Sequence, residues 1–286
     1  MKQLFDSHAH INADECTGQQ REMLAHSIET SEVAYVIDVG YDMASSRRAV
    51  ENAAKYPWCF AAVGIHPLYI PDTKTHMSPE AHATEQDVLS GLELLANMDG
   101  VRAVGEIGLD YHMDDTPRAV QQRVFREQIR LALRLKLPIT IHDRDSHEDV
   151  CDILKEEGVF GAVRKAAFPE NPQTGQADAR VLLHAYSGSA EQALQYVKLG
   201  ASIGIGGTVT YENNRKAAAV AAVVPLANLL IETDAPFMAP EPFRGSPNAS
   251  PLIRYTAAKI AEIKEISIEA LAAATMENGK RFFNIV

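Results

Sequence analysis

Residues 101–142 read VRAVGEIGLDYHMDDTPRAVQQRVFREQIRLALRLKLPITIH, and the pattern within them indicates the fold class. The β-prone runs Val101–Glu106 and Pro138–His142 flank Arg118–Leu135, where apolar residues recur near helical spacing. A strand, a long helix and a second strand in this order predict two parallel strands with a covering helix. The stretch therefore predicts an α/β protein.

The same alternation continues along the whole chain. The β-prone runs are Leu4–His8, Ala34–Val39, Phe60–Ile65, Val101–Glu106, Pro138–His142, Val181–His184, Ala201–Ile205 and Leu229–Glu232. Helix-like stretches lie between or after them, at Ala44–Lys55, Arg118–Leu135, Ala190–Lys198 and Ile253–Ile263. Eight units favour a closed (β/α)8 barrel over an open doubly wound sheet, whose Gly-x-Gly-x-x-Gly signal is absent after the first run. We predict one TIM-like barrel over residues 1–286.

Composition and charge limit the classes of partner. The chain has 286 residues, of which 46% are hydrophobic and 23% charged, as in ordinary globular proteins. Its formal net charge of −11 argues against non-specific binding of duplex nucleic acid, which needs lysine and arginine against the phosphates. A nucleic-acid substrate would require a local site where divalent cations reverse the sign of the charge.

The cysteines and the apolar stretches favour a cytoplasmic protein. Cys16, Cys59 and Cys151 are odd in number and far apart, which indicates free thiols in a reducing compartment. The N-terminal residues lack the apolar stretch of a signal peptide, and the most apolar region, Ala217–Ile231, is too short to span a membrane. We expect no membrane association, and no obligate protein partner is evident.

Two connections are longer than a minimal barrel needs. Residues 71–86 and 165–178 are rich in proline and polar residues. Each is either a surface insertion or part of a substrate rim, because the loops that follow the strands line the active face of a barrel.

Ionisable side chains cluster where the apolar runs end. Five runs end in such residues, which are His8 with His10, Glu106, His142, His184 and Asp234. All strand carboxyl ends of a parallel barrel point to one rim, so these side chains are expected to converge there. Asp6, His8 and His10 share one face of the first strand, and their burial is costly unless they are paired or bind a metal.

Four imidazoles and two carboxylates indicate a metal centre. These donors suit Zn, Mn, Fe or Co, and six ligands are more than one catalytic zinc takes. Two divalent ions that share a bridging carboxylate fit better, and Glu106, which has glycine close by on both sides, is the candidate bridge. Two ions about 3.5–4 Å apart can activate a water and stabilise the attacking and leaving oxygens. This chemistry suits hydrolysis of a phosphodiester or another ester.

Six motifs in order carry a resemblance to a known family. They are Asp6-Ser-His-Ala-His, Gly64-Ile-His-Pro, Gly105-Glu-Ile-Gly-Leu-Asp-Tyr, Ile141-His-Asp-Arg-Asp, His184-Ala-Tyr-Ser-Gly and Glu232-Thr-Asp-Ala-Pro. Between Leu4 and about Phe283 the chain resembles the TatD family of metal-dependent deoxyribonucleases, within the amidohydrolase-like superfamily. The resemblance implies a TIM-like barrel, two divalent ions (Mg, Mn or Zn) and 3′-to-5′ exonuclease activity on DNA, with single-stranded ends as the preferred partner.

The resemblance also implies roles for individual residues. By motif, one ion would be held by His8, His10, Glu106 and Asp234, and the other by Glu106, His142 and His184. His66 resembles the family's phosphate-side histidine. We hypothesise that Asp234 or Glu106 orients or deprotonates the attacking water, and that His66 and Arg144 contact the non-bridging phosphate oxygens.

Other functions remain open from the sequence. One is a C–N, carboxyl-ester or phosphotriester hydrolase of the same superfamily, although such enzymes often carry a bridging carbamylated lysine where this chain has Glu106. A second is an aminoacyl-tRNA deacylase on the same metal site, and a third is a binding module without activity. Leu68 and the pair Ala185-Tyr186 depart from common family residues, and they bear on substrate preference rather than on the six ligands.

Overall fold

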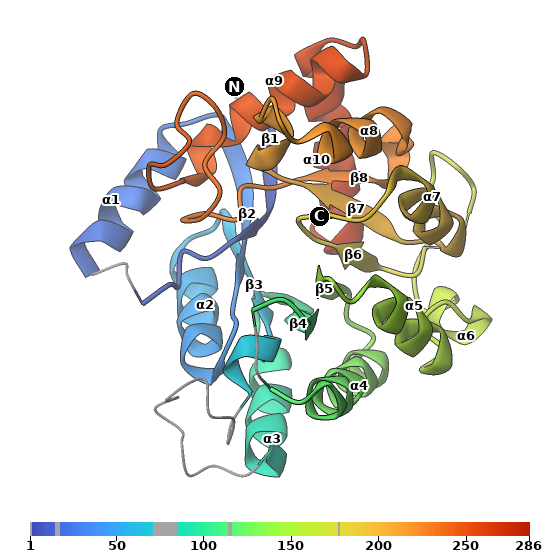
Figure 1. Cartoon of the computed structure of the whole chain (residues 1–286). Coiled ribbons are helices and arrows are strands. Elements are labelled where there is room, and N and C mark those ends of the chain that lie inside the picture. The colour runs from blue at the N-terminus through green and yellow to red at the C-terminus, as the bar shows by residue number, and fades with distance from the viewer. Residues whose placement is uncertain (1, 15–17, 71–84, 114–115, 177) are drawn as a thin grey trace.

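The chain folds into a barrel of eight parallel strands in the order β1 to β8 (Figure 1). The computed structural model describes residues 2–14, 18–70, 85–113, 116–176 and 178–286. The strands are β1 (Leu4–Ala9), β2 (Val33–Val39), β3 (Cys59–Val63), β4 (Val101–Asp110), β5 (Ile139–Arg144), β6 (Val181–Leu183), β7 (Ser202–Ile205) and β8 (Leu229–Ile231). A parallel bridge between Ala9 and Ala235 joins the last strand's extension to the first. The predicted (β/α)8 barrel is confirmed.

Helices surround the barrel (Figure 1). They are α1 (Gly18–Glu29), α2 (Met43–Lys55), α3 (Glu85–Ala96), α4 (Arg118–Leu135), α5 (His147–Glu156), α6 (Ala162–Lys165), α7 (Ala190–Leu199), α8 (Arg215–Val223), α9 (Ile253–Ile263) and α10 (Ile268–Phe282). The four helix-like stretches of the sequence agree with α2, α4, α7 and α9 to within one residue at each end. Among the described residues, no helix is long and apolar enough to cross a bilayer.

The amino ends of the strands are closed by an apolar floor. Phe5 of β1 stacks on Phe283, which follows α10, with ring centroids 5.8 Å apart. Phe282 and Phe283 are both fully buried among inward side chains of the other strands. Gly279 of α10 allows this approach, since a Cβ there would lie 2.6 Å from the ring of Phe5. Apolar side chains therefore fill the barrel at the amino ends of the strands, and the ionisable side chains lie at the carboxyl ends.

A buried carboxylate helps to close the barrel above this floor. Asp6 of β1 accepts hydrogen bonds from the backbone N–H of Thr233 at 2.9 Å and from its hydroxyl at 2.6 Å. Its pKa is raised to about 7 by burial, although the bonds from Thr233 act in the opposite direction. Asp6 thus pairs with the segment after β8, and its hydrogen bond with His8 is to the backbone N–H and not to the imidazole.

The interpretation of residues 165–178 as a substrate rim is wrong. This connection leads from α6 into β6, so it lies at the amino ends of the strands. Asn171 donates to the carbonyl of Ala227, and Asp178 pairs with Arg180 and Arg281 near the end of α10. The segment packs against the floor, at the end of the barrel opposite the histidines. Of the other connection, residues 71–84 lie outside the described residues, and Gln86 belongs to α3.

Candidate metal-binding active site

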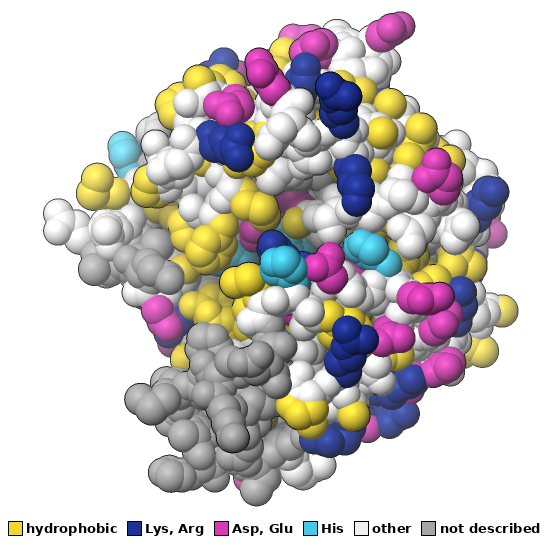
Figure 2. All heavy atoms as spheres, in the orientation of Figure 1, with side chains coloured by type: hydrophobic (Ala, Val, Ile, Leu, Met, Phe, Trp, Pro, Cys, Tyr) yellow, Lys and Arg dark blue, Asp and Glu magenta, His cyan; other side chains and the backbone are white. Residues whose placement is uncertain are grey.

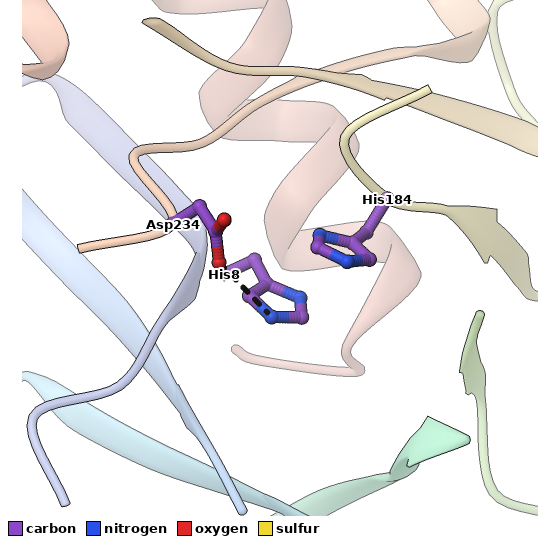
Figure 3. Close-up of side chains that lie close together, drawn as sticks. All are labelled: His8, His184 and Asp234. Atoms are coloured by element: carbon purple, nitrogen blue, oxygen red, sulfur yellow. Dashed lines mark ion pairs between the residues drawn. The ribbon is translucent and has the colours of Figure 1, made fainter. Parts of the chain in front are cut away.

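The six predicted ligands converge at the carboxyl ends of the strands. Acidic and histidine side chains gather in and around a central hollow on this face (Figure 2). His8 from β1, His184 after β6 and Asp234 after β8 lie side by side (Figure 3), with the two imidazole rings stacked 3.8 Å apart. Residues more than 200 positions apart in sequence therefore meet because every strand delivers its last side chains to one rim.

One group of donor atoms surrounds His10. Its Nε2 lies 3.2 Å from His8 Nε2, 3.6 Å from Glu106 Oε2 and 3.3 Å from Asp234 Oδ1. His8 Nε2 lies 3.5 Å and 3.9 Å from the same two oxygens. His10 Nδ1 is 2.6 Å from the carbonyl oxygen of Val39, which can only accept, so the neutral ring carries its proton on Nδ1. Its Nε2 then presents a lone pair to two carboxylates.

This arrangement fits a bound cation. Buried lone pairs on imidazole nitrogens and carboxylate oxygens repel one another when no proton lies between them. A divalent ion at their centre would replace this repulsion with attraction. Donors about 2.0–2.2 Å from one ion in a tetrahedron lie about 3.3–3.6 Å apart. The observed separations of 3.2–3.9 Å match that spacing. The four side chains are therefore arranged as a coordination shell.

A second group of donors faces the other oxygen of Glu106. Its Oε1 lies 2.8 Å from His184 Nε2 and 2.9 Å from His142 Nδ1. Glu106 thus directs Oε2 to the histidines of β1 and Oε1 to the histidines of β5 and β6. The two oxygens are oriented as in a carboxylate that bridges two ions, while the 2.8–2.9 Å separations on the Oε1 side are those of hydrogen bonds with the imidazoles.

Both ligand carboxylates are held in the ionised form. Burial alone would raise the pKa of Glu106, but the charge of His184 and the other nearby imidazoles outweigh it and hold the pKa well below the usual range. Burial acts in the same direction on Asp234, but without a cation a protonated His10 can donate from Nε2 to Asp234, and this bond lowers the pKa of the carboxyl. Two ionised carboxylates among buried imidazoles provide the negative charge that a cation pair requires.

His66, at the end of β3, lies beside this centre with its proton directed into it. The backbone N–H of Leu68 donates to His66 Nδ1 at 3.1 Å, so a neutral ring must carry its proton on Nε2. That Nε2 is 3.6 Å from Glu106 Oε1. Burial and the charge of His142 lower the pKa of His66 to about 3, which keeps the ring neutral. In this state His66 acts as a hydrogen-bond donor, although His66, Glu106 and His142 also form a group of donor atoms that could hold a metal ion.

Arg144 stands apart from the other predicted site residues. It ends β5 with an exposed side chain at the mouth of the barrel. Among the described residues, polar contacts link the other seven predicted site residues around Glu106. The Arg144 guanidinium makes none of these contacts. The structure therefore places Arg144 on the rim and not beside Glu106.

Sequence reasoning missed two carboxylates behind the ligand histidines. Asp110, at the end of β4, has Oδ2 3.0 Å from His142 Nε2, while Oδ1 accepts backbone N–H bonds from His112 and Met113. Glu232, just after β8, is fully buried and has Oε1 3.5 Å from His184 Nδ1. Both lie within motifs noted in the sequence, but only the folded structure shows that they face imidazoles. Such partners orient a ligand histidine and fix which nitrogen carries the proton.

Two glutamines on α4 were also missed. Gln128 accepts from Ile65 N–H at 2.7 Å and donates to Ile65 O at 3.0 Å, which fixes the residue before His66. Gln121 makes the same paired contacts with Asp110, both at 2.9 Å. Each is about 1% exposed, on the apolar face of the helix. The sequence did offer a signal for them, because glutamine stands at two positions where helical spacing predicts buried apolar residues, and a buried amide needs hydrogen-bond partners.

Replacing Asp110 with asparagine is expected to weaken metal binding about 10- to 100-fold. Burial would raise the pKa of Asp110, but the bonds from His142 and Met113 lower it to about 2, so an ionised acceptor is lost. The amide retains the size of the side chain, and isothermal titration with Zn²⁺ or Mn²⁺ measures the change. Asp149→Asn is the control, because Asp149 bonds to Tyr111 and to no ligand histidine. Unchanged affinity in Asp110→Asn would show that the carboxylate does not position His142.

A parallel eight-stranded barrel with cation-binding side chains at the carboxyl ends of its strands has the architecture of a metal-dependent hydrolase. Comparison with known proteins narrows the class. The family described as TatD related DNase matches residues 5–284, and the chain belongs to this family. The family resemblance drawn from six motifs is thereby confirmed.

Relatives and solved structures agree with this membership. An uncharacterized metal-dependent hydrolase, YabD of Bacillus subtilis (strain 168), is 38% identical over 282 residues, which cover 99% of both chains. The crystal structure of YjjV, a TatD homolog from Escherichia coli K12, has a TM-score of 0.82 at 30% identity and covers 100% of this chain and 99% of that one. A TatD family hydrolase from Entamoeba histolytica shares the fold, with a TM-score of 0.80 at 20% identity over 100% and 99% of the two chains.

Proposed function

We propose that this protein is a deoxyribonuclease that uses two divalent ions (Mg, Mn or Zn) to remove nucleotides from single-stranded DNA ends in the 3′-to-5′ direction. The observation that carries the proposal is the position of Glu106, whose two oxygens face separate groups of imidazoles at 2.8–3.6 Å. A bridged pair of cations suits in-line displacement at phosphorus, where the attacking and leaving oxygens both need stabilisation.

The side chains have distinct tasks in this reaction. His8, His10, Glu106 and Asp234 would hold one ion, and Glu106, His142 and His184 the other, as the family motifs imply. Bound divalent cations would lower the pKa of a coordinated water and offset the charge of the phosphate. Asp234, whose Oδ1 lies 3.3 Å from His10 Nε2, would orient the water and accept its proton.

His66 and Arg144 would contact the phosphate from different sides. The Nε2–H of His66 points to the centre and can donate to a non-bridging oxygen as negative charge develops on it. Arg144, exposed on the rim, would contact a phosphate that extends beyond the hollow. The free thiols Cys59 and Cys151 fit a protein that works in the cytoplasm.

Labelled oligonucleotides test the proposal directly. We expect the metal-depleted protein to be inactive, and Mg²⁺, Mn²⁺ or Zn²⁺ to restore stepwise shortening of single-stranded DNA from its 3′ end. Labels placed at the 3′ and 5′ ends give the direction of digestion. Aminoacyl-tRNA, a lactone and an amide ester are assayed beside the DNA. Preferential hydrolysis of one of these with any of the metals would replace the nuclease assignment, and a protein that hydrolyses none of them would be a binding module.

His66→Asn is expected to lower kcat on DNA about 10²- to 10³-fold while the bound metal stays unchanged. The asparagine oxygen can replace Nδ1 as acceptor for Leu68 N–H, but no donor remains at the position of Nε2. His66→Gln is the matched variant, because its amide N–H₂ reaches the position of Nε2 and should recover part of the rate. Metal content is measured by mass spectrometry of the purified variants. A loss of bound metal in His66→Asn would make His66 a ligand and contradict its role as donor.

A further inference from the structure

An aromatic ring stands half-exposed at the edge of the candidate centre. Phe237 follows Asp234 by three residues, and it is 49% exposed. Its ring centroid lies 6.0 Å from that of His10, with the planes inclined by 64°. Apolar side chains border part of the central hollow on this face of the molecule (Figure 2). Met238, the next residue, is 38% exposed, and neighbouring apolar side chains left open beside a polar hollow indicate a contact surface for a ligand.

The backbone that carries this ring is fixed. Phe237 N–H donates to Asp234 O at 2.8 Å, which joins the backbones of the two residues. The buried Asn248 donates from Nδ2 to Phe237 O at 2.7 Å and to Thr233 O at 2.8 Å. The ring is therefore presented by an ordered segment, so little conformational entropy is lost when a ligand packs on it.

More aromatic side chains continue from this ring around the same side of the centre. Tyr41 lies 5.7 Å from the ring of His10, and Tyr69 lies 4.6 Å from Tyr41 and 6.1 Å from His66. The aromatic groups thus extend from the proposed phosphate donor, past one metal ligand, to Phe237. Of these rings, Phe237 is the one that combines substantial exposure with contact to a ligand histidine.

We propose that Phe237 stacks on the nucleobase of the nucleotide at the cleavage site. This inference rests on the proposed function, and it makes an unpaired base part of what the site recognises. In a nucleic acid the base is attached one sugar away from its phosphate. A phosphate held between His66 and the metal ions proposed to bind Glu106 would therefore place a base near the surrounding aromatic side chains.

The chemistry of the ring indicates the kind of selectivity. A phenyl ring offers no hydrogen bond, and every base has a face that can stack on it, so recognition is general for bases and not for sequence. A base inside a duplex is stacked on both faces, and a terminal base must give up its pairing partner to enter the site, which favours single-stranded ends. Esters without an aromatic group next to the scissile bond would lose this contact.

The experiment compares two single-stranded oligonucleotides that differ only in their last residue. One ends in thymidine and the other in a stable abasic residue at the 3′ end. The release of the terminal residue is measured for the metal-loaded wild type, Phe237→Leu and Phe237→Trp. Binding is measured separately by fluorescence anisotropy with phosphorothioate-protected oligonucleotides. Phe243→Leu is the matched control, since Phe243 lies in the same loop, is 37% exposed and packs on Tyr255 at 5.2 Å.

We expect the wild type and Phe243→Leu to prefer the base-containing end by about tenfold in KM and in affinity. Phe237→Leu should reduce this preference to about twofold with kcat little changed, and Phe237→Trp should keep it. An unchanged preference in Phe237→Leu, or none in the wild type, would overturn the inference and leave the nuclease assignment intact. If binding depends on the terminal base but no hydrolysis occurs, the nuclease assignment would be refuted and the inference about Phe237 would stand.

Discussion

Glu106→Gln is expected to lower kcat by about 10³-fold or more, because a cation pair supplies several kcal/mol of stabilisation and each 1.4 kcal/mol is a factor of ten. The carboxylate is the group that both sets of imidazoles share, with Oε1 2.8 Å from His184 and Oε2 3.5 Å from His8. An amide offers one oxygen and no charge. The bound metal should therefore fall from two ions to less than one per chain.

Metal analysis and kinetics on the same preparation check this result. Glu148→Gln is the control, because Glu148 is an exposed carboxylate in the first turn of α5, at the same end of the barrel. It should retain metal and activity. Circular dichroism establishes that the Glu106 variant is folded. Full activity of Glu106→Gln with two bound ions would refute the bridging role and the mechanism built on it.

The sequence was sufficient to predict the barrel and the side chains that gather at the carboxyl ends of its strands. Strand and helix periods are local signals, and α4 and α9 begin and end where helical spacing placed them. The convergence of these side chains was predictable for a topological reason, since parallel strands place their last residues on one rim whatever their separation in the chain. His8 and Asp234 could be paired in this way before any contact between them was known.

The supporting residues could not be predicted, because their roles depend on contacts between elements. Asp110 acts on His142 of the neighbouring strand, and Gln128 holds the backbone of Ile65, which is 63 residues away. Nothing in the sequence around a buried glutamine names its partner. The substrate-rim interpretation of residues 165–178 is wrong for a related reason, since loop composition does not indicate which end of a barrel a connection covers.

The two halves of the centre differ in what stands behind their histidines. On one side, His142 and His184 face the carboxylates of Asp110 and Glu232. On the other side, His10 Nδ1 faces the carbonyl oxygen of Val39 and not a carboxylate. A second candidate ligand carboxylate, Asp234, lies 3.3 Å from His10 Nε2. In the half with His142 and His184, additional negative charge would come from carboxylates behind the histidines. In the half with His8 and His10, it would come from Asp234 itself. Two ions bound in these halves would therefore respond differently to substitution.

Asp234→Asn is expected to remove one ion of the two and to lower kcat about 10²- to 10⁴-fold, as the loss of a general base does. Asp234 Oδ1 lies 3.3 Å from His10 and 3.9 Å from His8, whereas Glu106 Oε1 still joins the other half to His184. Asparagine suits the backbone here, since residue 234 has a φ of 56° and asparagine tolerates this conformation.

The matched control for this variant is Asp145→Asn. Asp145 also has a positive φ, of 55°, but its carboxylate is exposed on the rim and pairs with His112. The same substitution in the same backbone conformation should leave two ions and the wild-type rate. Loss of both ions in Asp234→Asn would show that the halves are not separable, and two ions with full activity would exclude Asp234 as both ligand and base. One remaining ion with a depressed kcat is the result that assigns Asp234 to the half formed by His8 and His10.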